Sequence, residues 1–209
     1  MELSTYILLL INFSVIGLLP RVFFRQDGKF TFMWFMTAAP YLFAPIVFSF
    51  QYFGLFSIPT INFPDLLSMV FHVVGITLSA LSIGIIFMTV GTHRIPVALW
   101  HQQQENDQPV HIVTWGSYKF IRHPFYTSFL LAFIACILVT LNVAVMAIAA
   151  YTLIILNYTA SKEEKRLSTE PGDIGLTYQS YILRTGRFFP KLTSLMNEST
   201  QQHESNMTP

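Results

Sequence analysis

Charged residues are scarce in this chain, and their scarcity decides its class. Asp, Glu, Lys and Arg make up 11% of the 209 residues, whereas a soluble domain carries about 25%. Hydrophobic residues make up 53%, and the mean hydropathy is +0.51. This composition excludes an ordinary soluble domain and predicts an all-α integral membrane protein. The net charge of +1 gives no reason to expect nucleic acid as a partner.

Residues for three other kinds of site are also missing. The single cysteine, Cys136, excludes an intramolecular disulfide. No Gly-x-Gly-x-x-Gly follows a plausible strand, so the sequence gives no sign of a Rossmann nucleotide-binding motif. His101 and Glu105 lie one helical turn apart, but two ligands do not make a metal site, and no bound metal is predicted.

Long apolar stretches predict five transmembrane helices. They cover residues 3–19, 32–58, 66–90, 125–141 and 143–160. All 12 Lys and Arg residues follow the first, third or fifth of these spans, and the loops on the other side carry none. The positive-inside rule then places the N-terminus outside and the C-terminus in the cytosol. For a multi-pass protein of this kind, the cytoplasmic membrane is the simplest expectation.

The chain divides into three predicted regions. Residues 1–90 form three N-terminal transmembrane helices. Residues 91–192 form a core of a cytosolic connector, a transmembrane hairpin and cytosolic helices that cap a site. After the last span the helix is expected to break at Pro171-Gly172 and to resume around residues 176–183. Residues 193–209 are rich in Ser, Thr, Gln, Asn and Glu and are predicted to be disordered.

Two polar clusters flank the transmembrane hairpin. One precedes it and contains Arg122 and His123, and the other follows it and contains Glu163 and Glu164. A hairpin returns both of its ends to the same face of the bilayer, so the clusters are expected to meet there. Consecutive residues point about 100° apart on a helix. Only one of the two glutamates is therefore expected to face the Arg-His pair directly.

Several short motifs follow one another in this region of the chain. They are His111-Ile112-Val113-Thr114-Trp115-Gly116-Ser117-Tyr118, Arg122-His123-Pro124-Phe125-Tyr126, Glu163-Glu164-Lys165-Arg166-Leu167, Gly175-Leu176-Thr177-Tyr178-Gln179-Ser180-Tyr181 and Arg187-Phe188-Phe189-Pro190. Their order and spacing resemble the signature of the isoprenylcysteine carboxyl methyltransferase and phospholipid methyltransferase superfamily, which consists of integral membrane methyltransferases. The resemblance covers roughly residues 91–190.

This resemblance implies a cofactor, a class of substrate and a set of site residues. The cofactor would be S-adenosylmethionine, bound without a Rossmann fold. The methyl acceptor would be lipophilic: an isoprenylated carboxylate or thiol, a phospholipid amine or a related lipid. The cofactor-binding residues would be His111, Val113, Gly116, Tyr118, Arg122, His123, Pro124 and Glu163. The catalytic residues would be Arg122, His123, Tyr126, Glu163 and Glu164.

The chemistry of these residue types is compatible with that role. A carboxylate can hold the sulfonium and ammonium groups of the cofactor, and Arg122, His123 or a helix N-terminus can hold its carboxylate. A base is needed only when the acceptor is an amine or a hydroxyl. His123, His111, Glu163 or Tyr126 could then take the proton, and the sequence does not choose among them.

Two other classes of function stay open from the sequence. One is an NADPH-dependent membrane reductase of related architecture, and the other is a non-catalytic lipid-binding membrane protein. The sequence determines neither the identity of the acceptor nor the oligomeric state.

Overall fold

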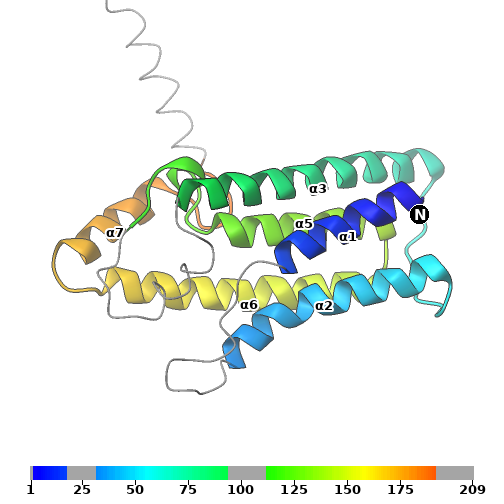
Figure 1. Cartoon of the computed structure of the whole chain (residues 1–209), viewed down its shortest axis with the longest axis horizontal. Helices are drawn as coiled ribbons and strands as arrows, with labels where there is room; N and C mark the ends of the chain where they lie inside the picture. Colours follow the sequence, from blue (N-terminus) through cyan, green and yellow to red (C-terminus); the bar gives the residue numbers. More distant parts are fainter. Residues whose placement is uncertain (1, 18–31, 94–111, 192–209) are drawn as a thin grey trace, which may run out of the picture.

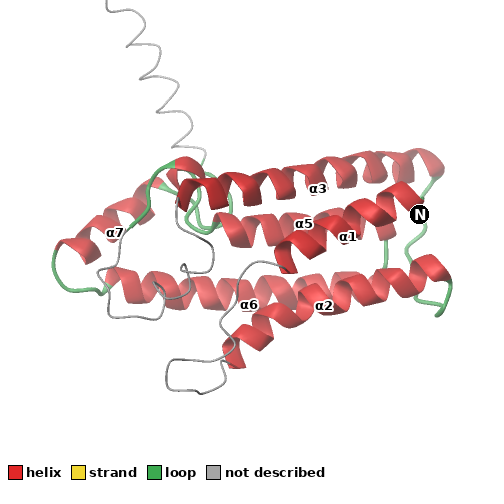
Figure 2. Cartoon of the chain, in the orientation of Figure 1, coloured by secondary structure: helices red, strands yellow, loops and turns green. Residues whose placement is uncertain are grey.

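The computed structural model describes residues 2–17, 32–93 and 112–191, and within these ranges the chain is helical with no strand (Figure 2). Its elements are α1 (Leu3–Gly17), α2 (Phe32–Phe53), α3 (Asp65–His93), the 3₁₀ helix η1 (Gly116–Lys119), α5 (Pro124–Thr140), α6 (Val143–Ser168) and α7 (Asp173–Arg184). The five long helices run side by side, with the N-terminus at one end and η1 and α7 at the other (Figure 1).

Each of the five apolar stretches is a helix, although some ends differ from the prediction. The second was expected to reach residue 58, but α2 ends at Phe53 because Gly54 adopts a left-handed φ of 66°. The third was expected to end at residue 90, whereas α3 continues to His93. The chain after α6 breaks at Pro171-Gly172 as predicted, and α7 begins directly afterwards, at Asp173. The predicted disordered tail and most of the predicted connector lie outside the described residues.

Two of these helices are long and apolar enough to cross a bilayer. The most apolar stretches of Asp65–Thr92 and Val143–Ser168 have mean hydropathies of 2.3 and 1.8. Only 28% and 22% of these stretches is buried inside the protein, whereas the core helix of a soluble protein would be mostly covered. Leu3–Val15 and Pro124–Thr140 are shorter apolar helices. The outward-facing apolar surface of α3 and α6 therefore fits contact with lipid.

The interior of the bundle combines close backbone packing with a small polar layer. A Cβ atom on Gly75 of α3 would lie 2.7 Å from the Val139 side chain, so this glycine lets α3 and α5 approach closely. Near the middle of the bundle, Asn12 of α1 donates to the Ser79 hydroxyl at 2.9 Å and accepts from Ser82 at 3.1 Å. These buried hydrogen bonds join α1 to α3.

The hairpin between α5 and α6 turns within two residues. Leu141 has a left-handed φ of 49°, and the side chain of Asn142 caps α6 by accepting from the amides of Ala144 and Val145. Gln51 of α2 donates to the backbone of Thr140 at 3.1 Å and accepts from Asn142 at 2.7 Å. The turn is therefore fixed at one end of the bundle, and it brings the start of α5 and the end of α6 together at the other end.

Candidate active site

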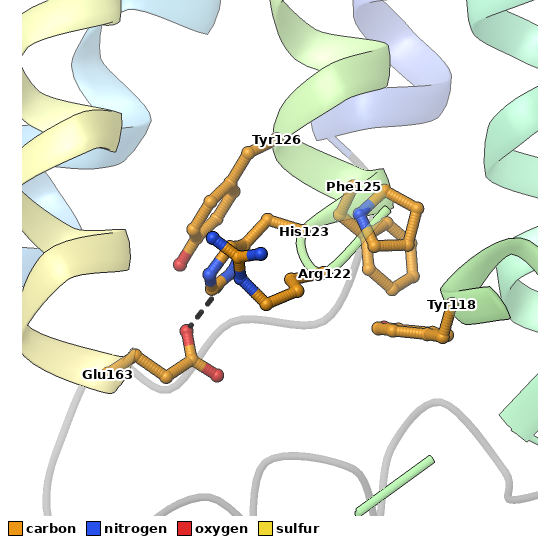
Figure 3. A pocket seen from close by; sticks show the side chains of 7 residues that line it. Tyr118, Arg122, His123, Phe125, Tyr126 and Glu163 are labelled. Atoms are coloured by element: carbon orange, nitrogen blue, oxygen red, sulfur yellow. Dashed lines mark ion pairs between the residues drawn. The ribbon is translucent and has the colours of Figure 1, made fainter. Parts of the chain in front are cut away.

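A pocket lies where α5 begins and the polar end of α6 passes it. It holds about 330 Å³ of empty space, part of it open to solvent. Its lining consists of Tyr118, Arg122, His123, Pro124, Phe125, Tyr126 and Glu163 (Figure 3). The two polar clusters that flank the hairpin therefore meet in one place, as the sequence predicts.

The backbone of Arg122 and His123 is held by the segment that follows α7. The Arg122 amide donates to the Gly186 carbonyl at 2.9 Å, and the His123 amide donates to the Arg187 carbonyl at 3.1 Å. Gly186 in turn donates to Phe120 at 3.1 Å. This short parallel pairing ends where Pro124 occupies the first turn of α5, a position that needs no N–H donor.

Glu164 lies at the centre of the ionic contacts. Its Oε1 accepts from Arg122 Nε at 2.8 Å, from Arg187 Nε at 3.2 Å and from His123 Nε2 at 3.2 Å. Its Oε2 accepts from Arg187 Nη2 at 2.5 Å. The Glu164 side chain is only 9% exposed. Both oxygens of this carboxylate are therefore satisfied by the protein itself.

These contacts determine the ionisation of Glu164, which lies beyond the apolar part of α6. Burial by itself would raise the pKa of its carboxyl group. The hydrogen bonds from its three partners and the charge of Arg122 outweigh burial and lower the pKa well below its ordinary value of 4.5. Glu164 is therefore a carboxylate at neutral pH and acts only as a hydrogen-bond acceptor.

Glu163 has a different position, on the wall of the pocket. Its Oε2 lies 3.7 Å from His123 Nδ1, and its side chain is 35% exposed. Only Glu164 bonds directly to the Arg-His pair, as expected for one of the two glutamates, but Glu163 is not turned away from it. The two carboxylates straddle the imidazole ring, with Glu164 at one ring nitrogen and Glu163 near the other.

Aromatic side chains hold the His123 ring in place. The ring stacks on Tyr126 with a centroid distance of 5.2 Å and an angle of 6° between the planes. Phe188 contacts it at a centroid distance of 6.2 Å. The His123 side chain is only 6% exposed, so its orientation is fixed by packing as well as by Glu164.

The 3₁₀ helix η1 forms the opposite wall of the pocket through Tyr118. The Tyr181 hydroxyl of α7 donates to the Tyr118 carbonyl at 2.6 Å. Ser117 and Thr89 of α3 are buried and their hydroxyls lie 3.0 Å apart. Gly116 begins η1 with a left-handed φ of 62°, and a Cβ atom there would lie 2.1 Å from the Thr92 hydroxyl. Both α3 and α7 therefore position this wall.

The structure brings most of the predicted site residues together. Tyr118, Arg122, His123, Pro124, Tyr126 and Glu163 line the pocket, and Glu164 lies directly behind His123. Val113 and Gly116 are outside the lining. His111 lies outside the described residues. The functional roles of all these residues stay predictions.

Sequence reasoning missed Arg187 as part of the site. Arg187 binds Glu164 and also donates to Asn157 at 2.7 Å and to Ser161 at 3.0 Å. The sequence contained a signal, since Arg187 begins the last of the motifs that resemble the family signature. Phe125 also lines the pocket; it stands in the quoted motif of residues 122–126, but it was given no role because its side chain is apolar.

Comparison with known proteins supports one family. Residues 68–170, just under half of the chain, match the family described as phospholipid methyltransferase. No curated protein matches the chain. The matched segment runs from α3 through η1, α5 and α6, and it includes every lining residue of the pocket. The match confirms the resemblance seen in the sequence. The two motifs at residues 175–181 and 187–190 lie beyond the matched segment.

Proposed function

From the phospholipid methyltransferase match over residues 68–170, we propose that this protein is an integral membrane S-adenosylmethionine-dependent methyltransferase. Its acceptor is lipophilic: an isoprenylated carboxylate or thiol, a phospholipid amine or a related lipid. The observation that carries the proposal is the position of Glu163, a 35% exposed carboxylate on the wall of a pocket at the end of an apolar helix bundle.

The residues of the pocket fit the charges of this cofactor. Glu163 supplies a carboxylate for a sulfonium or an ammonium group, because its own contact with His123 is a long one of 3.7 Å. Arg122 is less suited to bind the cofactor's carboxylate than the sequence motif suggests, because its guanidinium group already has partners in the protein. Its Nε donates to Glu164, and its Nη1 donates to the carbonyls of Ile182 and Thr185.

The start of α5 is a better anion site than Arg122. Phe125 and Tyr126 line the pocket within the first turn of this helix. The first amides of a helix have no intrahelical acceptor and favour an anion. We assign the cofactor's carboxylate to the Tyr126 amide at this helix start, with Tyr118 on the facing wall.

S-adenosylmethionine supplies an activated methyl group when it is bound. The protein's part is to position the two reactants in line and to exclude water. The stacked rings of His123 and Tyr126, with Phe188 behind them, provide a rigid aromatic wall for both tasks.

The apolar bundle sets how the two substrates reach the pocket. All five long helices cross the membrane in this proposal, with the N-terminus outside and the pocket at the cytosolic face of the cytoplasmic membrane. The acceptor then enters from the bilayer and the cofactor from the cytosol. Twelve basic residues on the cytosolic side support this orientation.

Calorimetry with S-adenosylhomocysteine on the detergent-purified protein tests the proposal. We expect binding in the micromolar range, at least about tenfold weaker in Glu163→Gln because a charge-assisted contact is lost. His111→Ala should also weaken binding if the family resemblance holds there. Glu170→Gln is the matched control, because Glu170 lies after α6 and outside the pocket, and it should bind like the parent.

Absence of binding to a folded parent protein would overturn the methyltransferase proposal, and NADPH would then be the next ligand to measure. Binding without any methyl transfer to the acceptor classes named above would favour the non-catalytic lipid-binding alternative.

A further inference from the structure

The two nitrogens of the His123 ring face different carboxylates. Nε2 lies 3.2 Å from Oε1 of Glu164, which is a hydrogen-bond distance. Nδ1 lies 3.7 Å from Oε2 of Glu163, which is too long for a hydrogen bond. The ring itself is buried and stacked on Tyr126, so the two nitrogens cannot exchange places without repacking.

The surroundings of Glu164 determine which nitrogen carries the proton. Glu164 is ionised and has no hydrogen to donate. Its Oε1 already accepts from Arg122 and Arg187, so the contact with His123 forms only if Nε2 carries a hydrogen. Neutral His123 therefore has its hydrogen on Nε2 and its lone pair on Nδ1.

The lone pair on Nδ1 is directed toward the pocket. It faces Oε2 of Glu163 across 3.7 Å, and both atoms are acceptors that a hydrogen-bond donor in the pocket can reach. In the part of the chain that the structure describes, the other charged or titratable groups around the ring are Glu164 on α6, Arg122, Tyr126 on α5, and Arg187 after α7. Tyr118 lies across the pocket, and burial raises the pKa of its phenol well above 10.0, which keeps it neutral.

We propose that Nδ1 of His123 is the base that takes the proton from a methyl acceptor bearing an N–H or O–H group. Glu164, Arg122 and Arg187 are positioning residues, which fix the tautomer and the ring. Glu163 and Glu164 together stabilise the imidazolium that forms between them. The inference deepens the proposed methyltransferase function and rests on it.

The transfer balances without any further reactant. The acceptor's nitrogen or oxygen forms a bond to the methyl carbon, the methyl–sulfur bond breaks with its electron pair staying on sulfur, and the acceptor's proton passes to Nδ1. A carboxylate acceptor has no proton to lose, so its methylation does not depend on this base.

The tautomer is measured directly by NMR on detergent-solubilised protein labelled with ¹⁵N at the histidine ring. His123→Gln identifies the His123 signals among those of the 6 histidines, and His123→Asn repeats the assignment should the first variant fold poorly. We expect the neutral ring to have an unprotonated Nδ1 and a protonated Nε2. A hydrogen on Nδ1 in the neutral ring would overturn the proposal, whatever the activity of the protein.

Turnover provides the second arm of the test. His123→Gln keeps an amide donor near the position of Nε2 and has no base at Nδ1. We expect methyl transfer to phosphatidylethanolamine in mixed micelles to fall about 10²–10⁴-fold further than transfer to a carboxylate acceptor, with both rates measured at saturating S-adenosylmethionine. N-acetyl-S-farnesylcysteine is the carboxylate acceptor in this comparison, and exogenous imidazole should restore part of the lost amine methylation.

The outcomes separate this inference from the proposed function. Amine methylation that survives in His123→Gln, or a loss of amine and carboxylate methylation in parallel, overturns the role of His123 as a base and leaves the methyltransferase intact. A parent protein that binds no S-adenosylhomocysteine refutes the methyltransferase and with it the base. If the parent methylates neither probe, the NMR measurement alone decides the inference.

Discussion

Replacing Glu164 by Gln should destabilise this protein more than an exchange of any residue that lines the pocket. The variant keeps the shape of the side chain but removes the charge that Arg122, Arg187 and His123 share. Two guanidinium groups then lie close together without their common carboxylate. Removing one partner from a buried ion pair costs about 3–5 kcal/mol, and we expect a loss of that size in the free energy of unfolding. The midpoint of thermal or denaturant unfolding in detergent measures it.

The same exchange should also change how stability depends on pH. In the folded protein the pKa of Glu164 is well below 4.5, whereas in the unfolded chain it is near 4.5. Below about pH 4.5 the unfolded state therefore binds more protons than the folded state, and the contribution of Glu164 to stability is lost as the pH falls. Between about pH 5 and pH 3, the parent should lose stability more steeply than Glu164→Gln, because the variant has no carboxyl group to titrate at this position.

Glu163→Gln is the control for both effects. It makes the same chemical change one residue away, at a side chain that is 35% exposed and makes only a long contact with His123. Its unfolding midpoint should stay close to that of the parent, while its affinity for S-adenosylhomocysteine falls. Equal destabilisation by the two exchanges would show that Glu164 does not hold the ionic cluster together.

Much of the architecture was predictable from local patterns in the sequence. Apolar runs located five helices, and the turn at Asn142 was visible as a polar break between two of them. The predicted span of residues 125–141 begins directly after Pro124, and α5 includes this proline because proline is tolerated in the first turn of a helix. The meeting of the two polar clusters followed from hairpin geometry alone. These features depend on the hydropathy of short stretches and on the conformational limits of proline, and both can be read from neighbouring residues in the sequence.

Other features of the site depend on contacts between distant segments, and no local pattern contains them. The distinct positions of Glu163 and Glu164 arise because the His123 ring lies between them, with one ring nitrogen toward each carboxylate. Helical spacing predicts that the side chains of Glu163 and Glu164 point about 100° apart. It cannot show that the imidazole ring of His123 lies between them, with one nitrogen toward each carboxylate. Arg187 joins the site only because the segment after α7 folds back along α5 and pairs with Arg122 and His123.

This segment after α7 gives the second prediction with a large expected effect. Replacing Gly186 by Ala should disrupt the pocket, although Gly186 does not line it. A Cβ atom at this position would lie 1.6 Å from the carbonyl oxygen of Phe189 and 2.8 Å from its carbonyl carbon. Both are backbone atoms, so the turn itself has to move, and it cannot move without displacing Arg187. Overpacking of this kind costs about 1–3 kcal/mol, and more where the backbone cannot relax.

The displacement should reach the site through the backbone pairing of Gly186. Its carbonyl accepts from Arg122 and its amide donates to Phe120, so a shifted turn releases the residues that hold His123 against Glu164. We expect Gly186→Ala to lower the unfolding midpoint and to weaken binding of S-adenosylhomocysteine by at least about tenfold. Gly91→Ala is the matched control, because a Cβ atom there meets nothing within 4 Å and alanine is favoured by about 1 kcal/mol over glycine inside a helix such as α3. If Gly186→Ala binds S-adenosylhomocysteine as tightly as Gly91→Ala does, then the segment after α7 does not position the pocket, and Arg122 and His123 are held by α5 and α6 alone.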